Sequence, residues 1–188
     1  DLHKAIRRQR QMCIRDRVKG GKERYHSVFQ GLSACEHTDY VLIHDGARPF
    51  IEQEVIRHTM DEVQKKHACI AAVPVKDTIK KVDENGKVED TPPRKSLYTV
   101  QTPQAFSYSL IYDSYQKMIA DGREDVTDDA MVVEAYGKVP VYVIDGSYRN
   151  FKITTPEDLE MAEFMLNAGN PGKGVCLSLI HISEPTRP

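Results

Sequence analysis

The sequence lacks the features by which several large classes of protein are known. It holds no run of about 18 apolar residues, so we expect no membrane span. Its first residues lack the long apolar core of a secretory signal peptide, so we expect none. The cysteines have no Cys-x-x-Cys spacing, which argues against a zinc site or a disulfide framework and fits a reducing cytoplasm. They are Cys13, Cys35, Cys69 and Cys176.

Familiar catalytic and nucleotide-binding patterns are lacking as well. No Ser-His-Asp, Cys-His or zincin arrangement stands out. Residues 20–24 (GGKER), followed by Ser27, have the spacing of neither a P-loop nor Gly-x-Gly-x-x-Gly, so alone they indicate a phosphate or nucleotide site only weakly. No internal repeat is present. A chain of 188 residues with 40% hydrophobic content suits one domain with a sizeable core.

The net charge of −2 conceals an uneven distribution. Residues 1–19 contain seven Lys or Arg and two Asp or Glu, so the rest of the chain has a net charge of −7. A basic end is typical of nucleic-acid binding. However, residues 1–17 and 175–188 both resemble translated sequencing adapters, in particular MCIRDR and CLSLIHISEPTRP. We therefore expect non-native tails on either side of a domain at 18–174, and no nucleic-acid partner.

Strand and helix patterns alternate between the two tails. Continuous apolar runs predict strands buried on both faces, whereas apolar residues at helical spacing predict helices. This alternation predicts an α/β fold with a mostly parallel sheet. The expected strands are 40–44, 69–75, 97–101 and 139–144, and the main expected helices are 52–67, 107–120 and one that begins at Thr155-Pro156. Ser27 and Thr127 are expected to cap two further helices, and residues 102–104 (TPQ) are expected to form a turn.

A polar hairpin interrupts this pattern. Residues 78–90 contain Asn85-Gly86, a strong hairpin turn signal, and few apolar side chains. Such a hairpin has little apolar surface to pack against the body of the domain, so we expect it to project. A partner subunit is the obvious surface for it to rest on.

Residues 41–50 (VLIHDGARPF) are the most informative segment. An apolar strand ends at His44-Asp45, and Arg48 follows in a tight loop closed by Pro49. In open α/β sheets ligands bind at the carboxyl ends of strands. Asp45 is the candidate metal ligand, since magnesium prefers carboxylate oxygen and usually binds substrate phosphates as well. Arg48 can donate two hydrogen bonds to a phosphate. The alternatives are a turn-capping Asp45, a structural ion pair for Arg48 and a structural role for His44.

Two further cations are candidates of different strength. Lys152 lies in an otherwise apolar segment, where a partly buried ammonium needs a ligand anion or a carboxylate nearby. Arg94 follows Pro92-Pro93 on a loop and by itself would be interpreted as a solvated cation.

Six segments together resemble one known family, the 2-C-methyl-D-erythritol 4-phosphate cytidylyltransferases of isoprenoid biosynthesis. Each segment alone is a weak signal, but their order and spacing are specific, and they cover about residues 20–160. The segments are GGKERYHSVFQGL, VLIHDGARPF, AAVPVKDTI, QTPQAF, VTDDA and NFKITTPEDL.

The resemblance implies a cytoplasmic enzyme, bacterial or plastid, with a Rossmann-like nucleotidyltransferase fold. It implies transfer of CMP from CTP to 2-C-methyl-D-erythritol 4-phosphate, release of pyrophosphate and use of Mg²⁺ or another divalent cation. It also implies a homodimer held by embracing arms at about residues 78–100. Phosphoryl-type transfer of this kind needs positioning and charge neutralisation more than covalent help.

The resemblance also assigns roles to residues by motif match. It implies that Arg94 and Lys152 are catalytic, that Asp45 binds the metal and that Gly21 and Ser27 contact cytidine. Thr78 and Arg94, on or beside the arm, would serve the neighbouring subunit's site. The residues implied to hold the sugar-alcohol phosphate are Arg48, Thr78, Thr102 and Thr127.

One part of the family pattern has no counterpart in residues 1–19. The family begins with a strand and a glycine-rich loop that carries an Arg and a Lys for the triphosphate, and Arg7, Arg8 and Arg10 lack the glycines and the strand. We therefore expect a truncated domain that binds CTP poorly and turns over little or nothing. Two alternatives stay open: a ribitol 5-phosphate-type cytidylyltransferase, which shares the HD-x-x-RPF core, and a non-catalytic dimerising module.

Overall fold

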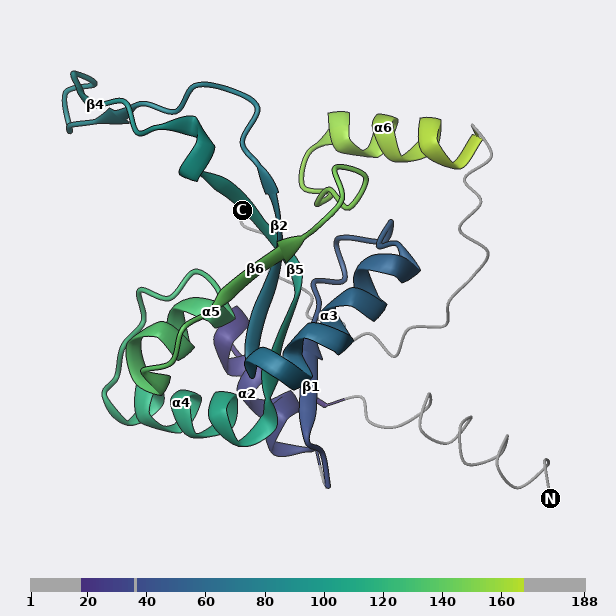
Figure 1. The fold of residues 1–188 in the computed structure, drawn as a ribbon, viewed down its shortest axis with the longest axis vertical. Coiled ribbons are helices and arrows are strands. Elements are labelled where there is room, and N and C mark those ends of the chain that lie inside the picture. The colour runs from purple at the N-terminus through teal and green to yellow at the C-terminus, as the bar shows by residue number, and fades with distance from the viewer. Residues whose placement is uncertain (1–17, 36, 168–188) are drawn as a thin grey trace.

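The computed structural model describes residues 18–35 and 37–167, which form an α/β domain with a four-stranded sheet and a separate two-stranded arm (Figure 1). The expected tails at 1–17 and 175–188, with Cys13 and Cys176, lie outside the described residues. Among the helices of the described part, none is both long and apolar enough to cross a membrane.

The sheet is mixed. Its strands are ordered β1 (Tyr40–Ile43), β5 (Tyr98–Ser107), β2 (Ala68–Pro74) and β6 (Tyr142–Asp145). β2 and β6 pair in parallel, whereas β5 lies antiparallel between β1 and β2. The α/β class is therefore confirmed, and β1, β2 and β6 share one direction as expected. The insertion of β5 makes two of the three strand pairings antiparallel.

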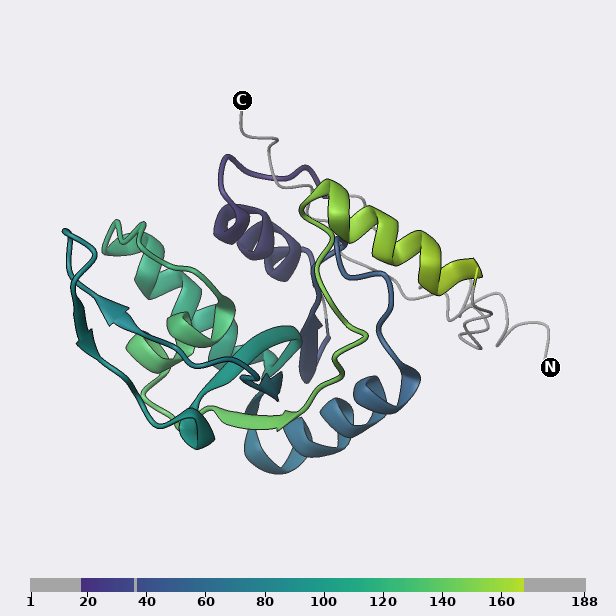
Figure 2. The ribbon, with the colours of Figure 1, turned by 90° about the horizontal axis from the view of Figure 1, so that it is seen from above.

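Helices cover both faces of the sheet (Figure 2). The helix α3 (Gln53–Lys66) packs on one face, and its Val55 and Val63 join Cys69, Ala71 and Ala105 of the sheet. The other face packs against α2 (Arg24–Ser33), α4 (Tyr108–Ala120), α5 (Asp129–Val132) and η2 (Val133–Gly137).

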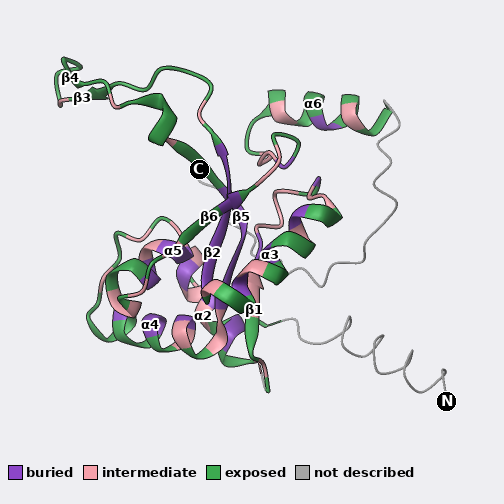
Figure 3. Ribbon diagram, viewed as in Figure 1, coloured by how far each residue is buried: buried purple, intermediate pink, exposed green. Residues whose placement is uncertain are grey.

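The strand β2 shows why a continuous apolar run in the sequence correctly predicted a buried strand. Its alternate residues enter two different cores, because Ala68 and Ile70 face α2 and α4 whereas Cys69 and Ala71 face α3. Both faces of β2 are thus buried (Figure 3). The strand β1 is less buried than expected, with only Ile43 fully covered, since it lies at an edge of the described sheet.

The arm comprises residues 75–97, between β2 and β5, and projects from the body (Figure 1). Every residue in it is exposed or half-buried, as the sequence predicts. Its strands are β3 (Lys81–Val82) and β4 (Val88–Asp90), and η1 (Arg94–Ser96) leads back to the sheet. Gly86 adopts φ +80° in the turn, where the Asp83 carbonyl accepts from its N–H at 3.1 Å.

Three local predictions were wrong. Residues 102–104 lie inside β5 rather than in a turn, because β5 pairs with strands on both sides. The ladder with β2 shifts register there, which accommodates Pro103, a residue without an N–H to donate. Ser27 lies inside α2, whose N-cap is Glu23, and Asp128 rather than Thr127 caps α5.

The last described helix, α6 (Pro156–Asn167), begins where predicted. The Thr155 hydroxyl accepts from the Asp158 N–H at 3.4 Å, and the Asp158 carboxylate accepts from the Thr155 N–H at 2.9 Å. The preceding strand, β6, is shorter than expected, since 139–141 do not pair with the sheet.

Candidate active site

The candidate site forms where the segments that follow β1 and β6 meet. These strands lie at opposite edges of the described sheet. The chain after β6 nevertheless returns to the loop after β1, and the Ala47 carbonyl accepts from the Ile153 N–H at 2.9 Å. Phe50 and Phe151 stack beside this contact with ring centroids 5.6 Å apart. The site thus lies beyond the carboxyl ends of β1 and β6, where α/β sheets bind ligands.

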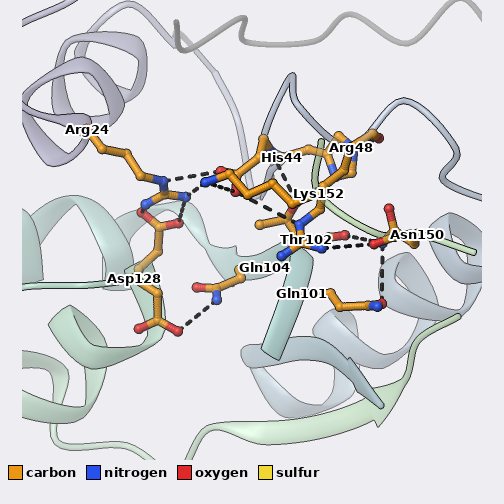
Figure 4. A network of polar contacts seen from close by, with 11 residues as sticks. Arg24, His44, Arg48, Gln101, Thr102, Gln104, Asp128, Asn150 and Lys152 are labelled. Carbon is orange, nitrogen blue, oxygen red and sulfur yellow. Dashed lines mark hydrogen bonds and ion pairs between the residues drawn. The ribbon is translucent and has the colours of Figure 1, made fainter. Parts of the chain in front are cut away.

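Three cations surround the Asp45 carboxylate at this junction. They are Arg24, Arg48 and Lys152, which Figure 4 labels. Arg24 donates from Nε to Oδ1 at 3.2 Å. Lys152 Nζ lies 3.6 Å from Oδ2, and Arg48 Nε lies 4.0 Å from the same oxygen. The structure therefore places a carboxylate beside Lys152, as its apolar sequence context requires.

The cations also govern the ionisation of Asp45. Burial alone would raise the pKa of this carboxyl group, but the charges of Arg24 and Lys152, the Arg24 hydrogen bond and the charge of Arg48 outweigh it. The pKa of Asp45 therefore lies below its ordinary value. Asp45 is an anion at neutral pH.

A buried carboxylate holds Arg24 from the opposite side. Asp129 is 0% exposed and accepts from Arg24 Nη1 at 3.1 Å and from Nη2 at 2.8 Å. The Tyr115 hydroxyl also donates to Asp129, at 2.6 Å. Burial and then the Asp129 charge raise the pKa of Tyr115, so this hydroxyl keeps its proton. Burial opposes the charge of Arg24, but Asp129 and Asp45 more than compensate and raise its pKa.

A second set of contacts fixes the backbone at Asp45. The Asp45 N–H donates to the Thr102 hydroxyl oxygen at 3.0 Å, and the same hydroxyl lies 2.9 Å from His44 Nδ1. His44 Nε2 lies 3.0 Å from the Arg48 carbonyl, which can only accept. Nε2 therefore donates, and Nδ1 accepts from Thr102. Burial lowers the pKa of His44, which agrees with this neutral form and with a structural role.

The segment after β6 orders Arg48. The Asn150 carbonyl accepts from Arg48 Nη1 at 2.9 Å, and the Asn150 amide donates to the Thr102 carbonyl at 2.7 Å. Gln101 donates to the Ser147 carbonyl at 2.9 Å. Arg48 Nε is buried without a hydrogen-bond partner among the described residues. An anionic ligand would supply one.

The start of α5 is held against β5 by a buried glutamine. Gln104 is 1% exposed, accepts from the Ala130 N–H at 2.9 Å and donates to Asp128 at 2.9 Å. Asp128 also accepts from the Met131 N–H at 2.9 Å. Gln104 and Thr102 are two residues apart on β5, so one strand supports both the Asp45 loop and the start of α5.

Gly21 and Ser27 lie together at the entry to α2. The Ser27 hydroxyl accepts from the Gly21 N–H at 2.9 Å. A Cβ at position 21 would come within 2.3 Å of His26 Cβ, so the tight approach requires glycine. Both lie close in sequence to Arg24, and thus on the α2 side of the Asp45 cluster.

Three of the predicted residues lie apart from the cluster around Asp45. Thr78 and Arg94 are exposed residues of the arm, and Arg94 donates to the Lys76 carbonyl at 2.9 Å. Thr127 is exposed just before α5, with its hydroxyl 3.8 Å from Met131 Sδ. The structure therefore brings Asp45, Arg48, Thr102 and Lys152 together, whereas the other three predicted residues lie outside this cluster.

The donor set limits the form that a metal site could take. Within 18–35 and 37–167, no group of three or more His, Cys, Asp or Glu side chains is arranged to hold a metal ion. Asp45 offers one partly exposed carboxylate, and Asp129 is fully buried. Magnesium is commonly bound by one or two carboxylates together with substrate phosphates, and Asp45 fits that arrangement.

Sequence reasoning missed four polar residues that build the site. Arg24, Gln104, Asp129 and Asn150 all lie within segments that were singled out, but none of them was named as a candidate for the site. The feature that could have marked them in the sequence is a charged or amide side chain close to a residue that was assigned a role. Tyr115 lies in the expected helix 107–120, and no pattern in the sequence marks its hydroxyl as a partner of Asp129.

The fold and this cationic cluster describe an α/β protein with a positively charged site beyond the carboxyl ends of β1 and β6. A family model described as 2-C-methyl-D-erythritol 4-phosphate cytidylyltransferase matches residues 3–168. The chain therefore belongs to the 2-C-methyl-D-erythritol 4-phosphate cytidylyltransferase family, and the resemblance seen in the sequence is confirmed. The match favours this family over the ribitol 5-phosphate alternative.

Individual relatives agree with the family match. The chain is 48% identical over 149 residues to the cytidylyltransferase of this name from Lachnoclostridium phytofermentans, with 79% of this chain and 64% of the relative covered. It is 47% identical over 150 residues to that of Lachnospira eligens, with 79% and 66% covered. The chain thus spans slightly less than two thirds of these relatives' length.

A solved structure shares the fold. The 4-diphosphocytidyl-2C-methyl-D-erythritol synthase of Anaerococcus prevotii matches with a TM-score of 0.75 and 37% identity, over 87% of this chain and 74% of that chain. This similarity confirms the fold predicted from the sequence.

Proposed function

We propose that this chain serves the transfer of CMP from CTP to 2-C-methyl-D-erythritol 4-phosphate, with release of pyrophosphate, in isoprenoid precursor synthesis. The observation that carries the proposal is the cluster of Arg24, Arg48 and Lys152 around Asp45 at the carboxyl end of β1, in a chain of this family. This cluster supplies positive charge where two polyanionic substrates would have to meet.

Charge neutralisation and alignment are the main tasks of such a site. An oxygen of the sugar-alcohol phosphate attacks the α-phosphorus of CTP in line, the bond from the α-phosphorus to the α,β-bridging oxygen breaks and pyrophosphate leaves. Lys152 and Arg48 would hold the attacking phosphate, and the absence of a hydrogen-bond partner for Arg48 Nε among the described residues supports this role. Gly21 and Ser27 would contact the cytidine at the entry to α2. Asp45 would hold a divalent cation, which neutralises phosphate charge when bound.

Residues outside the cluster would complete the site. We propose that Thr127, exposed before α5, contacts the sugar-alcohol phosphate. The Thr102 hydroxyl is occupied by the Asp45 N–H and His44, so it would contribute chiefly by shaping the Asp45 loop. Thr78 and Arg94 would act from the arm of a partner subunit in a cytoplasmic homodimer. The exposure of the whole arm supports that placement.

A pyrophosphate-release assay with CTP, Mg²⁺ and methylerythritol phosphate tests the proposal. Lys152→Gln should lower kcat/KM by about 10²-fold or more, the usual effect of removing a group that stabilises transition-state charge. Lys65→Gln is a matched control, since Lys65 pairs with Glu62 at 2.9 Å on the exposed surface of α3. Activity with ribitol 5-phosphate but not with methylerythritol phosphate would refute the proposed substrate. Near-native turnover would contradict only the expectation of a truncated chain with little or no activity.

A further inference from the structure

Arg24 touches two carboxylates that come from distant parts of the chain. Its Nε donates to Asp45 Oδ1 at 3.2 Å, and its two terminal nitrogens donate to Asp129 at 3.1 and 2.8 Å. Arg24 and Asp129 are 105 positions apart. The guanidinium therefore spans the gap between the loop after β1 and the start of α5 (Figure 4).

The contact with Asp129 is the fixed end of this bridge. Asp129 and Tyr115 are both 0% exposed, and Tyr115 donates to Asp129 at 2.6 Å. A buried carboxylate needs such partners, and a bidentate pair restricts the orientation of the guanidinium. Gln104 holds the backbone beside Asp129 through the Ala130 N–H. The contacts with Asp129 thus hold the Arg24 guanidinium in position independently of Asp45.

Asp45 is the movable end. The Arg24 hydrogen bond is the shortest contact between its carboxylate and any of the three cations, at 3.2 Å against 3.6 Å for Lys152 and 4.0 Å for Arg48. The last two contacts lie on the other carboxylate oxygen. Without Arg24, opposite charge would draw the carboxylate toward Lys152 and Arg48, because both already lie within an ion-pair distance.

We propose that Arg24 is a positioning residue that holds the Asp45 carboxylate back from Lys152 and Arg48, with Asp129 and Tyr115 as its anchor. Its effect on function would pass through Asp45, because it limits how closely the carboxylate pairs with the two cations that would bind an anionic substrate. This role rests on the proposed function only for the identity of that substrate. The positioning itself is a property of the cluster.

The first test measures the Asp45 side chain without any substrate. NMR couplings between its Hα and Hβ atoms report the side-chain rotamer in Arg24→Gln, and the Asp45→Asn spectrum assigns the signals. We expect a changed rotamer in Arg24→Gln and an intermediate one in Arg24→Lys, which keeps the charge but lacks the planar set of donors that holds both carboxylates in fixed directions. The control is Arg123→Gln, which removes a half-buried Arg that pairs with Asp125 at 2.6 Å and should leave Asp45 unchanged. An unchanged Asp45 in both Arg24 variants would overturn the proposal.

The second test measures binding of 2-C-methyl-D-erythritol 4-phosphate by calorimetry. Arg24→Gln should weaken affinity by about tenfold, the scale of one hydrogen bond to a charged group. Adding Asp45→Asn should restore most of that affinity, because the carboxylate that masks Lys152 and Arg48 is then gone. A merely structural role for Arg24 would leave the double variant no better than the single one, which would refute the mechanism.

The two readouts separate the possible failures. If the unsubstituted chain binds no methylerythritol phosphate, the proposed substrate is wrong, and the Asp45 rotamer still decides the role of Arg24. If Arg24→Gln does not fold, because Asp129 is left buried without its partner, Arg24→Lys and Tyr115→Phe carry the test. Tyr115→Phe loosens the anchor while it keeps Arg24, so it should shift the Asp45 rotamer less than Arg24→Lys does.

Discussion

The cluster around Asp45 and the arm at residues 75–97 both contain many charged residues, yet they differ in how those charges are used. In the cluster, Arg24 is shared between two carboxylates, and Asp129 is completely buried. In the arm, Lys81 pairs with Glu89 at 2.8 Å, and both side chains are largely exposed, at 69% and 44%. Both regions pair a basic side chain with a carboxylate, but they differ in burial and in the number of partners that each charge has.

Because the cluster is buried, the loss of one charged partner there should lower the free energy of unfolding substantially. A buried ion is tolerated only while its partners remain, and removal of one leaves the other charge unpaired in a poorly solvated site. Exposed pairs are screened by water and exchange their partners for solvent at little cost. We therefore expect substitutions in the cluster to change folding stability and substitutions in the arm to leave it almost unchanged.

The strongest test of this contrast is Asp129→Ala. The substitution leaves Arg24 with one carboxylate and Tyr115 without an acceptor, so we expect a loss of about 3–5 kcal/mol in the free energy of unfolding. Asp125→Ala breaks an Arg–Asp pair on the surface, where Asp125 is 73% exposed, and should cost less than about 1 kcal/mol. Urea denaturation of both variants measures the difference. Similar losses of unfolding free energy in the two variants would contradict the expected difference between a buried and an exposed ion pair.

Gln104→Leu should have the next largest effect. The substitution keeps the volume of the side chain but leaves the buried Ala130 N–H without its acceptor, so we expect a loss of about 2 kcal/mol. Gln64→Leu is the matched control, because Gln64 donates to the Met60 carbonyl on the exposed side of α3. A stable Gln104→Leu variant would show that water reaches the Ala130 N–H, and that the cluster is more open than its burial indicates.

The same contrast explains which parts of the molecule the sequence could reveal. The arm and β2 depend on neighbours in sequence, such as Asn85-Gly86 and a continuous apolar run, so both were predicted. Asp45 and Arg48 were found because charge follows an apolar strand directly. Lys152 stood out as a cation among apolar residues.

The missed features depend on partners that are distant in sequence. Residues 102–104 have the composition of a turn, but β1 and β2 pair with β5 on its two sides, and Gln104 pairs with both, so these residues stay within the strand. Arg24 owes its place to Asp129, which lies 105 positions away. No local pattern encodes such a pairing, so it becomes visible only when the sheet brings α2 and α5 together.

Acidification should weaken the cluster through His44. Burial lowers the pKa of His44 from its ordinary value of 6.5, so folding favours the neutral ring. The stability that this group contributes is therefore complete above about pH 6.5 and is lost as pH falls toward the folded-state pKa. We expect His44→Gln to reduce the dependence of unfolding free energy on pH between about 7 and 5, whereas the exposed His58→Gln should not. Equal pH profiles for the two variants would mean that His44 is not held neutral.

The smallest expected effect belongs to the arm. Lys81→Ala removes the ion pair with Glu89, and we expect the free energy of unfolding to change by less than about 0.5 kcal/mol, because both side chains are solvated. A loss above about 1 kcal/mol would exceed what a screened pair can contribute. It would mean that the arm is covered in solution, and a dependence of that loss on protein concentration would identify a second copy of the chain as the cover. The contrast with the cluster would then reflect assembly as well as burial within one chain.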